Sequence, residues 1–332
     1  MERIEIINDS YSTTKRLFKS RAYMELRGAD LEVKEGGLRL RGFTKENSEK
    51  LPLISVITIV YNAASVLEST IKSVLFQDYS NVEYIIIDGE SIDGTSYVIK
   101  KYDKCVDYWI SEKDKGIYDA MNKGAEFARG QWIIYMNAGD SFYNCDTLKK
   151  FVASISENEN AEIIYGDTYL HSEFGEKAFK MSDHRLLRIL NSHNTICHQS
   201  AFVRREVVQN LMFRDFKYSM DLEFWTRCLQ NGLKFKHISE IVSNYYVGGI
   251  SSSPNTALSV LIEHRIVKML WLRNYSTKAL ISLVFDYYKL YSKLFLRSFL
   301  GNKKYYKLKK SLKALNKRNV IVILVVLSIL LF

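Results

Sequence analysis

Hydrophobic and polar positions follow two alternating periods along the middle of the chain. Residues 54–61 read ISVITIVY, a largely apolar and β-branched run typical of a strand buried on both faces. ASVLESTIKSVLFQ follows with helical spacing, and VEYIIID at 82–88 is a second buried strand. A helix opening at SYVIKKY, a short strand around DYWIS, a helix over IYDAMNKGAEFARG and the strand WIIYMN continue the order. This succession predicts an α/β fold with a doubly wound, mostly parallel sheet.

Polar residues gather where these predicted strands end. Tyr61 and Asn62 close the first strand, Asp88 closes the second, and Asp140 follows the strand at 132–137. The loop that carries Lys115 opens near the same edge. Open α/β sheets bind ligands beyond the carboxyl ends of their strands, so we expect a ligand site here. The alternative for each residue is a turn or an N-cap, positions that favour Asp and Asn without any ligand.

The class of ligand is narrowed by motifs that the chain lacks. Neither the dinucleotide fingerprint G-x-G-x-x-G nor the phosphate loop G-x-x-x-x-G-K-[ST] follows the first strand, which argues against an ordinary NAD enzyme and a P-loop ATPase. A bound diphosphate would then need positive charge from Lys115 or from a divalent metal held by carboxylate oxygen. Asp140 at a strand end suits such a metal, Mn²⁺ or Mg²⁺.

Four blocks of sequence resemble the family-2 glycosyltransferases, and more narrowly the non-processive bacterial enzymes of polysaccharide, O-antigen and colanic-acid assembly. The blocks are PLISVITIVYNAASVLESTIKSVLFQ, VEYIIIDGESIDGT, DKGIYDAMNKGAEFARGQWIIYMNAGD and YSMDLEFWTRCLQNG. Together they cover roughly residues 50 to 250 in the family's order. The resemblance implies a GT-A type, Rossmann-like domain that binds a nucleotide-sugar, and an inverting transfer from that donor, usually a UDP-sugar, to an acceptor hydroxyl.

The resemblance also implies roles for individual residues. Tyr61 and Asn62 match the first nucleotide-contacting loop, and Asp88 would accept a hydrogen bond from the base. Asp140 takes the place of the last acidic residue of the metal-binding motif, and Asp221 falls where the family has its catalytic base. Four further residues match family positions near the donor: Asp93, Lys115, Asp119 and Asn122. Two residues, His198 and Gln199, match positions on the acceptor side.

The chain departs from the family's metal motif. Asn137 and Gly139 stand where many relatives have carboxylates, so Asp140 is alone and the remaining metal ligands would come from the diphosphate and water. Asp221 could also serve as the N-cap of a helix over LEFWTRCL, and Glu223 is the alternative base. A buried structural role is the alternative for His198. An inactive scaffold or membrane-docking partner in a polysaccharide assembly complex is the alternative function, and the thinned metal motif favours it.

The two ends of the chain have different characters. An N-terminal extension, 1–50, has a helical pattern from Tyr11 to Leu26 and a hairpin pattern in LEVKEGGLRLRGF. The glycosyltransferase domain is expected over 51–253, and basic amphipathic helices with an apolar tail over 254–332. From Pro254 onward the chain has 15 lysine and arginine residues and only two acidic ones. This segment therefore holds all the excess positive charge of a chain whose net charge is +10.

The basic segment favours a membrane surface over nucleic acid, because no nucleic-acid recognition motif accompanies the charge. Polar residues from Lys278 to Arg297 align on one stripe of an apolar, aromatic-rich helix, and residues 303–318 are strongly basic. The uncharged stretch 319–332 reaches about 21 Å as a helix, short of the roughly 30 Å of a hydrocarbon core. We therefore expect a peripheral protein on the cytoplasmic face of the bacterial inner membrane. A helix packed on the domain, or a homodimer contact, is the alternative.

The cysteine content and the N-terminal sequence agree with the expected cytoplasmic location. Four widely spaced cysteines indicate neither zinc nor disulfides, and the N-terminus lacks the apolar core of a secretion signal. Two other classes of enzyme are disfavoured. A processive synthase would carry a Q-x-x-R-W motif and several membrane helices, and the sequence indicates neither. A sugar-nucleotide pyrophosphorylase would carry a Gly-rich loop after the first strand, where this chain reads YNAAS. The sequence therefore predicts transfer from a nucleotide-sugar to a growing glycan, lipid-linked or free, at the membrane surface.

Overall fold

The computed structural model describes residues 11–12, 34–48, 50–172, 175–179 and 196–246, with positions 256, 259–260, 262–264 and 266–267 farther on. The chain divides into two compact units, Met1–Val247 and Gly248–Phe332. The predicted stripe at 278–297, the basic run and the apolar tail lie outside the described residues, and so does most of the helix expected from Tyr11. No helix in the described parts of the chain has the length and apolar character needed to cross a membrane. The domain boundary at 253/254 stays a prediction.

The first unit is built on a mixed sheet whose order is β2-β6-β5-β4-β7-β11-β9-β12-β8. Its parallel part consists of four strands: β6 (Tyr108–Ser111), β5 (Val82–Asp88), β4 (Ile54–Val60) and β7 (Trp132–Tyr135). β4 and β5 pair along their whole length, from Ile54 with Val82 to Val60 with Asp88. The predicted strands of the sequence are thus confirmed, and their carboxyl ends share one edge.

The remaining strands of the sheet depart from the parallel arrangement that the sequence predicts. Besides the edge strand β2 (Lys34–Gly36), they are β11 (Ala201–Arg204), β9 (Ile163–Ser172), β12 (Phe235–Tyr246), β8 (Ser141–Phe142) and β10 (Gly175–Phe179). β11 is antiparallel to β7 and β9, β8 to β12, and β10 to β9, whereas β9 and β12 run parallel. The short connection from β9 to β10 explains part of this, because parallel neighbours need a long crossover and hairpin neighbours do not.

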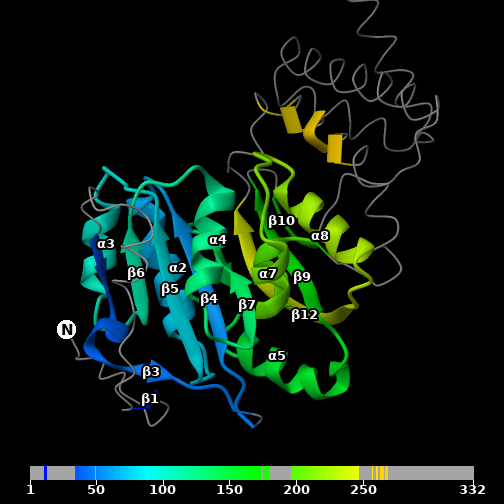
Figure 1. Cartoon of the computed structure of the whole chain (residues 1–332), viewed down its shortest axis with the longest axis horizontal. Helices are drawn as coiled ribbons and strands as arrows, with labels where there is room; N and C mark the ends of the chain where they lie inside the picture. The colour runs from blue at the N-terminus through cyan, green and yellow to red at the C-terminus, as the bar shows by residue number, and fades with distance from the viewer. Residues whose placement is uncertain are drawn as a thin grey trace, which may run out of the picture. The chain divides into compact units, whose positions relative to one another are not determined.

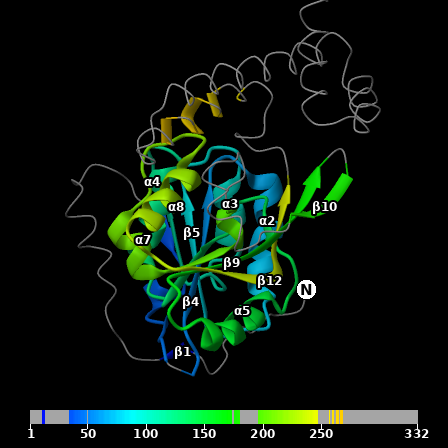
Figure 2. The ribbon, with the colours of Figure 1, turned by 90° about the vertical axis from the view of Figure 1, so that its right-hand side faces the viewer.

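Helices cover both faces of the sheet (Figure 1; Figure 2 turns the layers edge-on). Odd-numbered residues of β4, such as Ile57 and Ile59, pack against α4 (Ile117–Phe127), α7 (Arg205–Leu211) and α8 (Met220–Gln230). Even-numbered residues of β4, such as Ile54 and Val56, pack against the opposite layer of helices. That layer comprises α2 (Ala64–Leu75), α3 (Thr95–Lys101) and α5 (Thr147–Ile155), and the short helix η2 (Ser156–Asn158) continues α5. Alternate side chains of a strand point to opposite faces, so burial on both sides explains the unbroken apolar runs.

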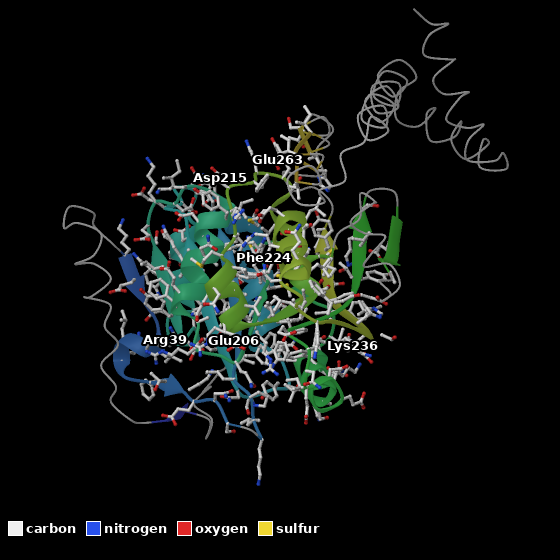
Figure 3. All side chains as sticks on the ribbon, turned by 45° about the vertical axis from the view of Figure 1, so that its right-hand side comes forward. Arg39, Glu206, Asp215, Phe224, Lys236 and Glu263 are labelled. Carbon is white, nitrogen blue, oxygen red and sulfur yellow. The ribbon has the colours of Figure 1, made fainter. Side chains whose placement is uncertain are left out.

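The hairpin predicted around Gly36 and Gly37 is wrong. β2 (Lys34–Gly36) adds antiparallel to β6, but Leu38–Arg41 then form the short helix η1 instead of a second strand. Gly37 has a φ of 103°, and the segment turns Arg39 inward, where its guanidinium pairs with buried Glu83 and donates to the carbonyl of Phe127 at 2.8 Å. Figure 3 labels Arg39 at this edge and Phe224 in the body of the unit. A small second sheet joins β3 (Thr44–Lys45) to β1 (Tyr11–Ser12).

Candidate functional site

Asp88 ends β5 with its side chain fully buried. Its carboxylate accepts hydrogen bonds from the hydroxyls of Ser91, at 2.5 Å, and Ser111, at 2.6 Å, and from the backbone N–H of Ser91 at 3.2 Å. Asp88 therefore organises the loop that follows it. The hydrogen bond to a nucleotide base that the resemblance implies for Asp88 stays a prediction.

The loops after β4 and β5 are locked to one another. The backbone N–H of Asn62 donates to Ser91 Oγ at 2.7 Å, and Asn62 Oδ1 accepts from the backbone N–H of Ile92 at 2.9 Å. Asp93 Oδ2 accepts from the N–H of Ala64 at 3.0 Å, in the first turn of α2. Asn62 has a φ of 48°, in the left-handed region that asparagine tolerates better than most residues. Asn62 and Asp93 thus shape the rim of the predicted donor site.

Tyr61 and Asp114 border the same rim on either side of Gly89. A side chain at Gly89 would place its Cβ 2.5 Å from Asp114 Oδ2 and 3.3 Å from Tyr61 Cδ2, so only glycine fits without moving them. The ring of Tyr61 is 64% exposed. Burial raises the pKa of Asp114, and the nearby charges of Asp119 and Asp88 add to this effect. Asp114 is thus the third carboxyl group at this rim, with Asp88 and Asp93.

Two lysines near this loop have different surroundings. Lys123 is buried, with its Nζ 2.8 Å from Glu112 Oε1 and 3.6 Å from Asp119 Oδ2. Lys115 is exposed, and its backbone N–H donates to Asp119 Oδ2 at 3.0 Å. The charge of Lys123 is thus compensated inside the protein, whereas Lys115 keeps its charge at the surface, where the sequence predicts a diphosphate contact.

Asn122 has a packing role in the structure. Its Nδ2 donates to the carbonyl of Phe213 at 2.8 Å, and its Oδ1 accepts from the N–H of Phe213 at 2.7 Å. This pair of bonds fixes α4 to the segment after α7. A contact of Asn122 with the donor stays a prediction.

Asp140 closes a tight turn after β7. The N–H of Asp140 donates to the carbonyl of Asn137 at 2.9 Å, and Gly139 takes a φ of 101°. Thr70 of α2 fastens the turn: its hydroxyl donates to the carbonyl of Asp140 at 2.7 Å and accepts from the N–H of Gly139 at 3.0 Å. Asp140 is only 8% exposed, so the turn holds a carboxylate in a nearly dry position.

Few groups compensate the charge of Asp140. Gln199 Nε2 approaches Oδ2 at 3.4 Å, and the backbone N–H of Tyr246 lowers the pKa of the carboxyl group. Burial raises the pKa of Asp140 to about 7, against the opposing effects of the His198 charge and the Tyr246 N–H. A buried carboxylate with so little compensation would gain from a cation beside it.

His198, in the short helix η4 (His198–Ser200), connects the polar groups of this edge. Its Nδ1 lies 2.8 Å from Asp221 Oδ2, and its Nε2 lies 2.9 Å from Asn137 Nδ2. An ionised carboxylate only accepts, so Nδ1 carries a proton, and Nε2 accepts from Asn137 Nδ2 when the ring is uncharged. Burial disfavours the charged ring, but the charge and hydrogen bond of Asp221, with the charge of Asp140, outweigh it and raise the pKa of His198.

The donor set of this edge fits a divalent cation only in part. Asn137 Oδ1 is buried and has no hydrogen-bond partner among the described residues, and it lies on the same turn as the Asp140 carboxylate. Amide and carboxylate oxygens are ligands that Mg²⁺ and Mn²⁺ accept. No cluster of three or more His, Cys, Asp or Glu suited to a metal occurs in the described part of the chain. A metal would therefore need most of its ligands from a bound diphosphate and water.

Asp221 lies in the first turn of α8, after the N-cap residue Ser219, so the interpretation of Asp221 as the cap is wrong. Its side chain is 24% exposed. The alternative base, Glu223, is also excluded: its side chain has no exposure and forms bonds of 2.7 and 2.8 Å with Arg227, so it cannot reach an acceptor. Asp167 pairs with His237 at 2.9 Å, a contact between neighbouring strands of the sheet.

The structure brings Asp140, His198, Gln199 and Asp221 together, although they come from three segments of the sequence. Asp88 lies two strands from β7, a separation of about 10 Å at normal strand spacing. No role was predicted for Ser91, Ser111 or Tyr246; the contacts of Ser111 with Asp88 and of Tyr246 with His171 join residues distant in the chain. Asn137 was noted only as a departure from the metal motif, and an amide three residues before Asp140, in the stretch NAGD, is the signal that could have identified it.

Comparison with known proteins bears on the family and the fold of the chain. Residues 55–212 match the model of Glycosyl transferase family 2. A PGL/p-HBAD biosynthesis glycosyltransferase of Mycobacterium tuberculosis is 31% identical over 212 residues, which cover 61% of this chain and 80% of that protein. An uncharacterized glycosyltransferase of Methanocaldococcus jannaschii is 27% identical over 208 residues, covering 59% of this chain and 71% of that protein.

Two solved structures have similar folds. S. aureus TarS 1–349, crystallised with UDP-GlcNAc, has a TM-score of 0.52 at 18% identity, covering 74% of this chain and 72% of that one. The mannosyltransferase PcManGT from Pyrobaculum calidifontis, in complex with GDP-Man and Mn²⁺, has a TM-score of 0.54 at 15% identity, covering 84% of this chain and 80% of that one. At these identities the likeness concerns the fold alone.

Proposed function

The chain belongs to glycosyltransferase family 2, and from this premise we propose that it transfers a sugar, with inversion, from a nucleotide-diphosphate donor to a hydroxyl of a growing glycan. The observation that carries the proposal is the continuous contact from Asp221 through His198 to Asn137, beside Asp140. This contact lies on the same edge of the sheet as Asp88. The edge thus offers one end for a nucleotide and another for proton transfer.

Asp221 is the proposed base. Transfer breaks the bond between the anomeric carbon and the diphosphate, so positive charge develops on the sugar and negative charge on the departing group. The acceptor hydroxyl attacks the opposite face of the sugar, and its proton passes to a carboxylate oxygen of Asp221. Its Oδ2 is held by the N–H of His198, which orients the carboxylate. Because Asp221 is partly exposed, an acceptor can approach it from solvent.

Asp140 and Asn137 are the residues that would hold a divalent cation, and the buried, unpartnered Oδ1 of Asn137 supports this assignment. Such an ion would stabilise the negative charge of the departing diphosphate. Lys115 supplies a further positive charge at the rim. The Mn²⁺ in the complex of PcManGT agrees with metal use by proteins of this fold.

The proposed donor is a UDP-sugar, as in the TarS complex, with a GDP-sugar as the second choice after the PcManGT complex. The proposed acceptor is a lipid-linked glycan at the cytoplasmic face of the inner membrane. The support for this location is the excess of basic residues after Pro254, which would be attracted to anionic lipid. Sedimentation with vesicles of phosphatidylglycerol, compared with neutral vesicles, tests the location, and equal partitioning to both would refute it.

Calorimetric titration of the full chain with UDP and with GDP, with and without Mn²⁺, tests the donor and the metal together. We expect binding that Mn²⁺ strengthens, and we expect Asp140→Ala to lose the strengthening. Glu157→Ala is the matched control, because Glu157 is an exposed acid in η2. Equal Mn²⁺ dependence in Asp140→Ala would remove Asp140 from the metal site. If the wild type binds neither nucleotide, the proposed transfer is wrong and the scaffold function is favoured.

A further inference from the structure

We propose that a platform of Tyr246, His171, Tyr169 and Glu176 binds a sugar ring of the acceptor beside the catalytic edge. This inference rests on the proposed function, since it names the acceptor-side subsite of that reaction. Figure 2 shows the strands that carry the platform, β9, β10 and β12, side by side at one end of the sheet.

Strand register brings the four side chains to one face. Tyr246 of β12 pairs with His171 of β9, and His171 pairs in turn with Glu176 of β10. Tyr169 lies two residues before His171, and side chains two residues apart in a strand point the same way. Val242, on the same face of β12 as Tyr246, is buried in the core. The face therefore begins in the core and emerges into solvent at Tyr246.

The rings of the platform are ordered by contacts with one another. Tyr246 and His171 stack with centroids 4.4 Å apart and planes inclined by 11°, and His171 meets Tyr169 edge-on at 5.0 Å. His171 covers one face of the Tyr246 ring, yet Tyr246 is still 53% exposed. A large aromatic side chain half in water, beside a catalytic edge, is a surface with unused capacity for an apolar contact.

Hydrogen bonds fix the central imidazole. His171 Nδ1 lies 2.9 Å from Glu176 Oε1, and its Nε2 lies 2.9 Å from Asn244 Oδ1. Asn244 in turn donates to Ser141 Oγ at 3.2 Å and to the carbonyl of Phe142 at 3.1 Å. A ligand would find the rings already positioned, so its binding would not have to order them.

The platform adjoins the reacting groups. Ser141 directly follows Asp140 and pairs in register with Asn244, which stands two residues before Tyr246, and Asn244 Nδ2 donates to Ser141 Oγ at 3.2 Å. A molecule lying on the Tyr246 ring is thus next to the segment that carries Asp140. The nucleotide end of the site is at Asp88 on β5, several strands away in the sheet order. This position assigns the platform to the acceptor and not to the donor.

A pyranose ring matches the chemistry of this surface. One face of many sugar rings consists of C–H groups that pack on an aromatic ring, whereas the hydroxyls around it need hydrogen-bond partners. Glu176, with a side chain 58% exposed, offers a carboxylate that accepts hydrogen bonds from such hydroxyls. An apolar protein segment would bury Glu176 unfavourably, so a saccharide fits the platform better.

Saturation-transfer NMR on the full chain tests the platform. The probes are the methyl glycosides of glucose, galactose, mannose, N-acetylglucosamine and rhamnose, with no nucleotide present. We expect at least one to receive saturation, Tyr246→Ala to reduce it at least fivefold, and Tyr246→Phe to retain it within twofold. Phe76→Ala is the matched control, because Phe76 is 58% exposed at the C-terminal end of α2. No saturation in the wild type, or equal saturation in Tyr246→Ala, would overturn the proposal.

A second measurement serves if Tyr246→Ala does not fold. In protein labelled with 3-fluorotyrosine, the ¹⁹F resonance absent from Tyr246→Phe belongs to Tyr246. It should shift on addition of the glycoside, and a fixed resonance would refute the subsite. These readouts need no donor, so they are separate from the nucleotide titration. Nucleotide binding with an unresponsive Tyr246 would remove the subsite alone, whereas glycoside binding without nucleotide binding would remove the transfer reaction alone.

Discussion

The Nδ1 atom of His198 lies 2.8 Å from Oδ2 of Asp221, although 23 positions separate the two residues in sequence. His198 precedes β11 and Asp221 opens α8, so the contact depends on how that helix packs against the sheet. The imidazole holds the carboxylate from one side and Asn137 holds the imidazole from the other. The first predictions concern this contact.

Asp221→Asn should lower kcat by about 10²- to 10⁴-fold, the usual contribution of a general base, while the Kd for nucleotide stays within twofold. Glu223→Gln is the comparison, since Glu223 lies two residues away but is buried against Arg227. That variant should be destabilised by about 1–3 kcal/mol, as expected when a hydrogen bond to a charged group is lost, with kcat per folded molecule retained. Steady-state kinetics and denaturant unfolding separate the two effects. Near-normal turnover by Asp221→Asn would eliminate Asp221 as the base.

His198→Gln should lower kcat by about tenfold or more, because Asp221 loses the group that orients it. The matched control is His237→Gln, which breaks a similar pair, with Asp167 at 2.9 Å, in the structural part of the sheet. The control should change the free energy of unfolding and leave kcat per folded molecule unaltered. Equal kcat values for the two variants would mean that the His198–Asp221 pair is structural only.

Acid stability should depend on Glu83. Burial opposes its charge, but Arg39, the Ser55 hydroxyl and the N–H of Arg129 together hold the pKa of Glu83 below its ordinary value of 4.5. The folded state therefore binds this proton less readily than the unfolded chain. The resulting stabilisation is complete above about pH 5 and is lost as the pH falls through the folded pKa.

Ser55→Ala removes a 2.6 Å hydrogen bond to Glu83. We expect a loss of about 1–3 kcal/mol at pH 7 that shrinks as the pH falls below 4.5. Thr58→Val is the control, because the Thr58 hydroxyl bonds to Tyr84 and to the carbonyl of Met136, neither of which titrates in this range. Its loss should not vary between pH 3 and 7. Urea unfolding at several pH values measures both, and parallel curves for the two variants would contradict the role of Glu83.

Gly89→Ala should weaken nucleotide binding by about tenfold while the protein still folds. The added Cβ would lie 2.5 Å from Asp114 Oδ2, so the carboxylate must move at the rim of the predicted donor site. The double variant Gly89→Ala/Asp114→Ala removes the clash. If the clash is the cause, the two substitutions will be non-additive in the binding free energy. Strict additivity would place the effect of Gly89→Ala elsewhere.

The order of strands and helices over the parallel part of the sheet was predictable because it depends on local patterns. The apolar runs ending at Val60, Asp88 and Tyr135 each form the expected strand. The hairpin predicted at Gly36 was wrong because the segment depends on a distant contact. Arg39 enters the core and pairs with Glu83, a residue 44 positions later. The mixed half of the sheet was missed for the same reason: β11, antiparallel to β9, and β12, parallel to β9, are placed by pairing across long stretches of chain.

The sequence by itself determined which residue types stand at the ends of the strands, and with them the family and the candidate residues Asp88, Asp140 and Asp221. Only the tertiary structure decided their surroundings. It buried Asp140 on the turn with Asn137, joined His198 to Asp221, and removed Glu223 into an ion pair. Strand periodicity is a local property that one stretch of chain can specify. The charge and hydrogen bonds of a carboxylate depend instead on groups that meet only when helices and strands from distant positions pack together.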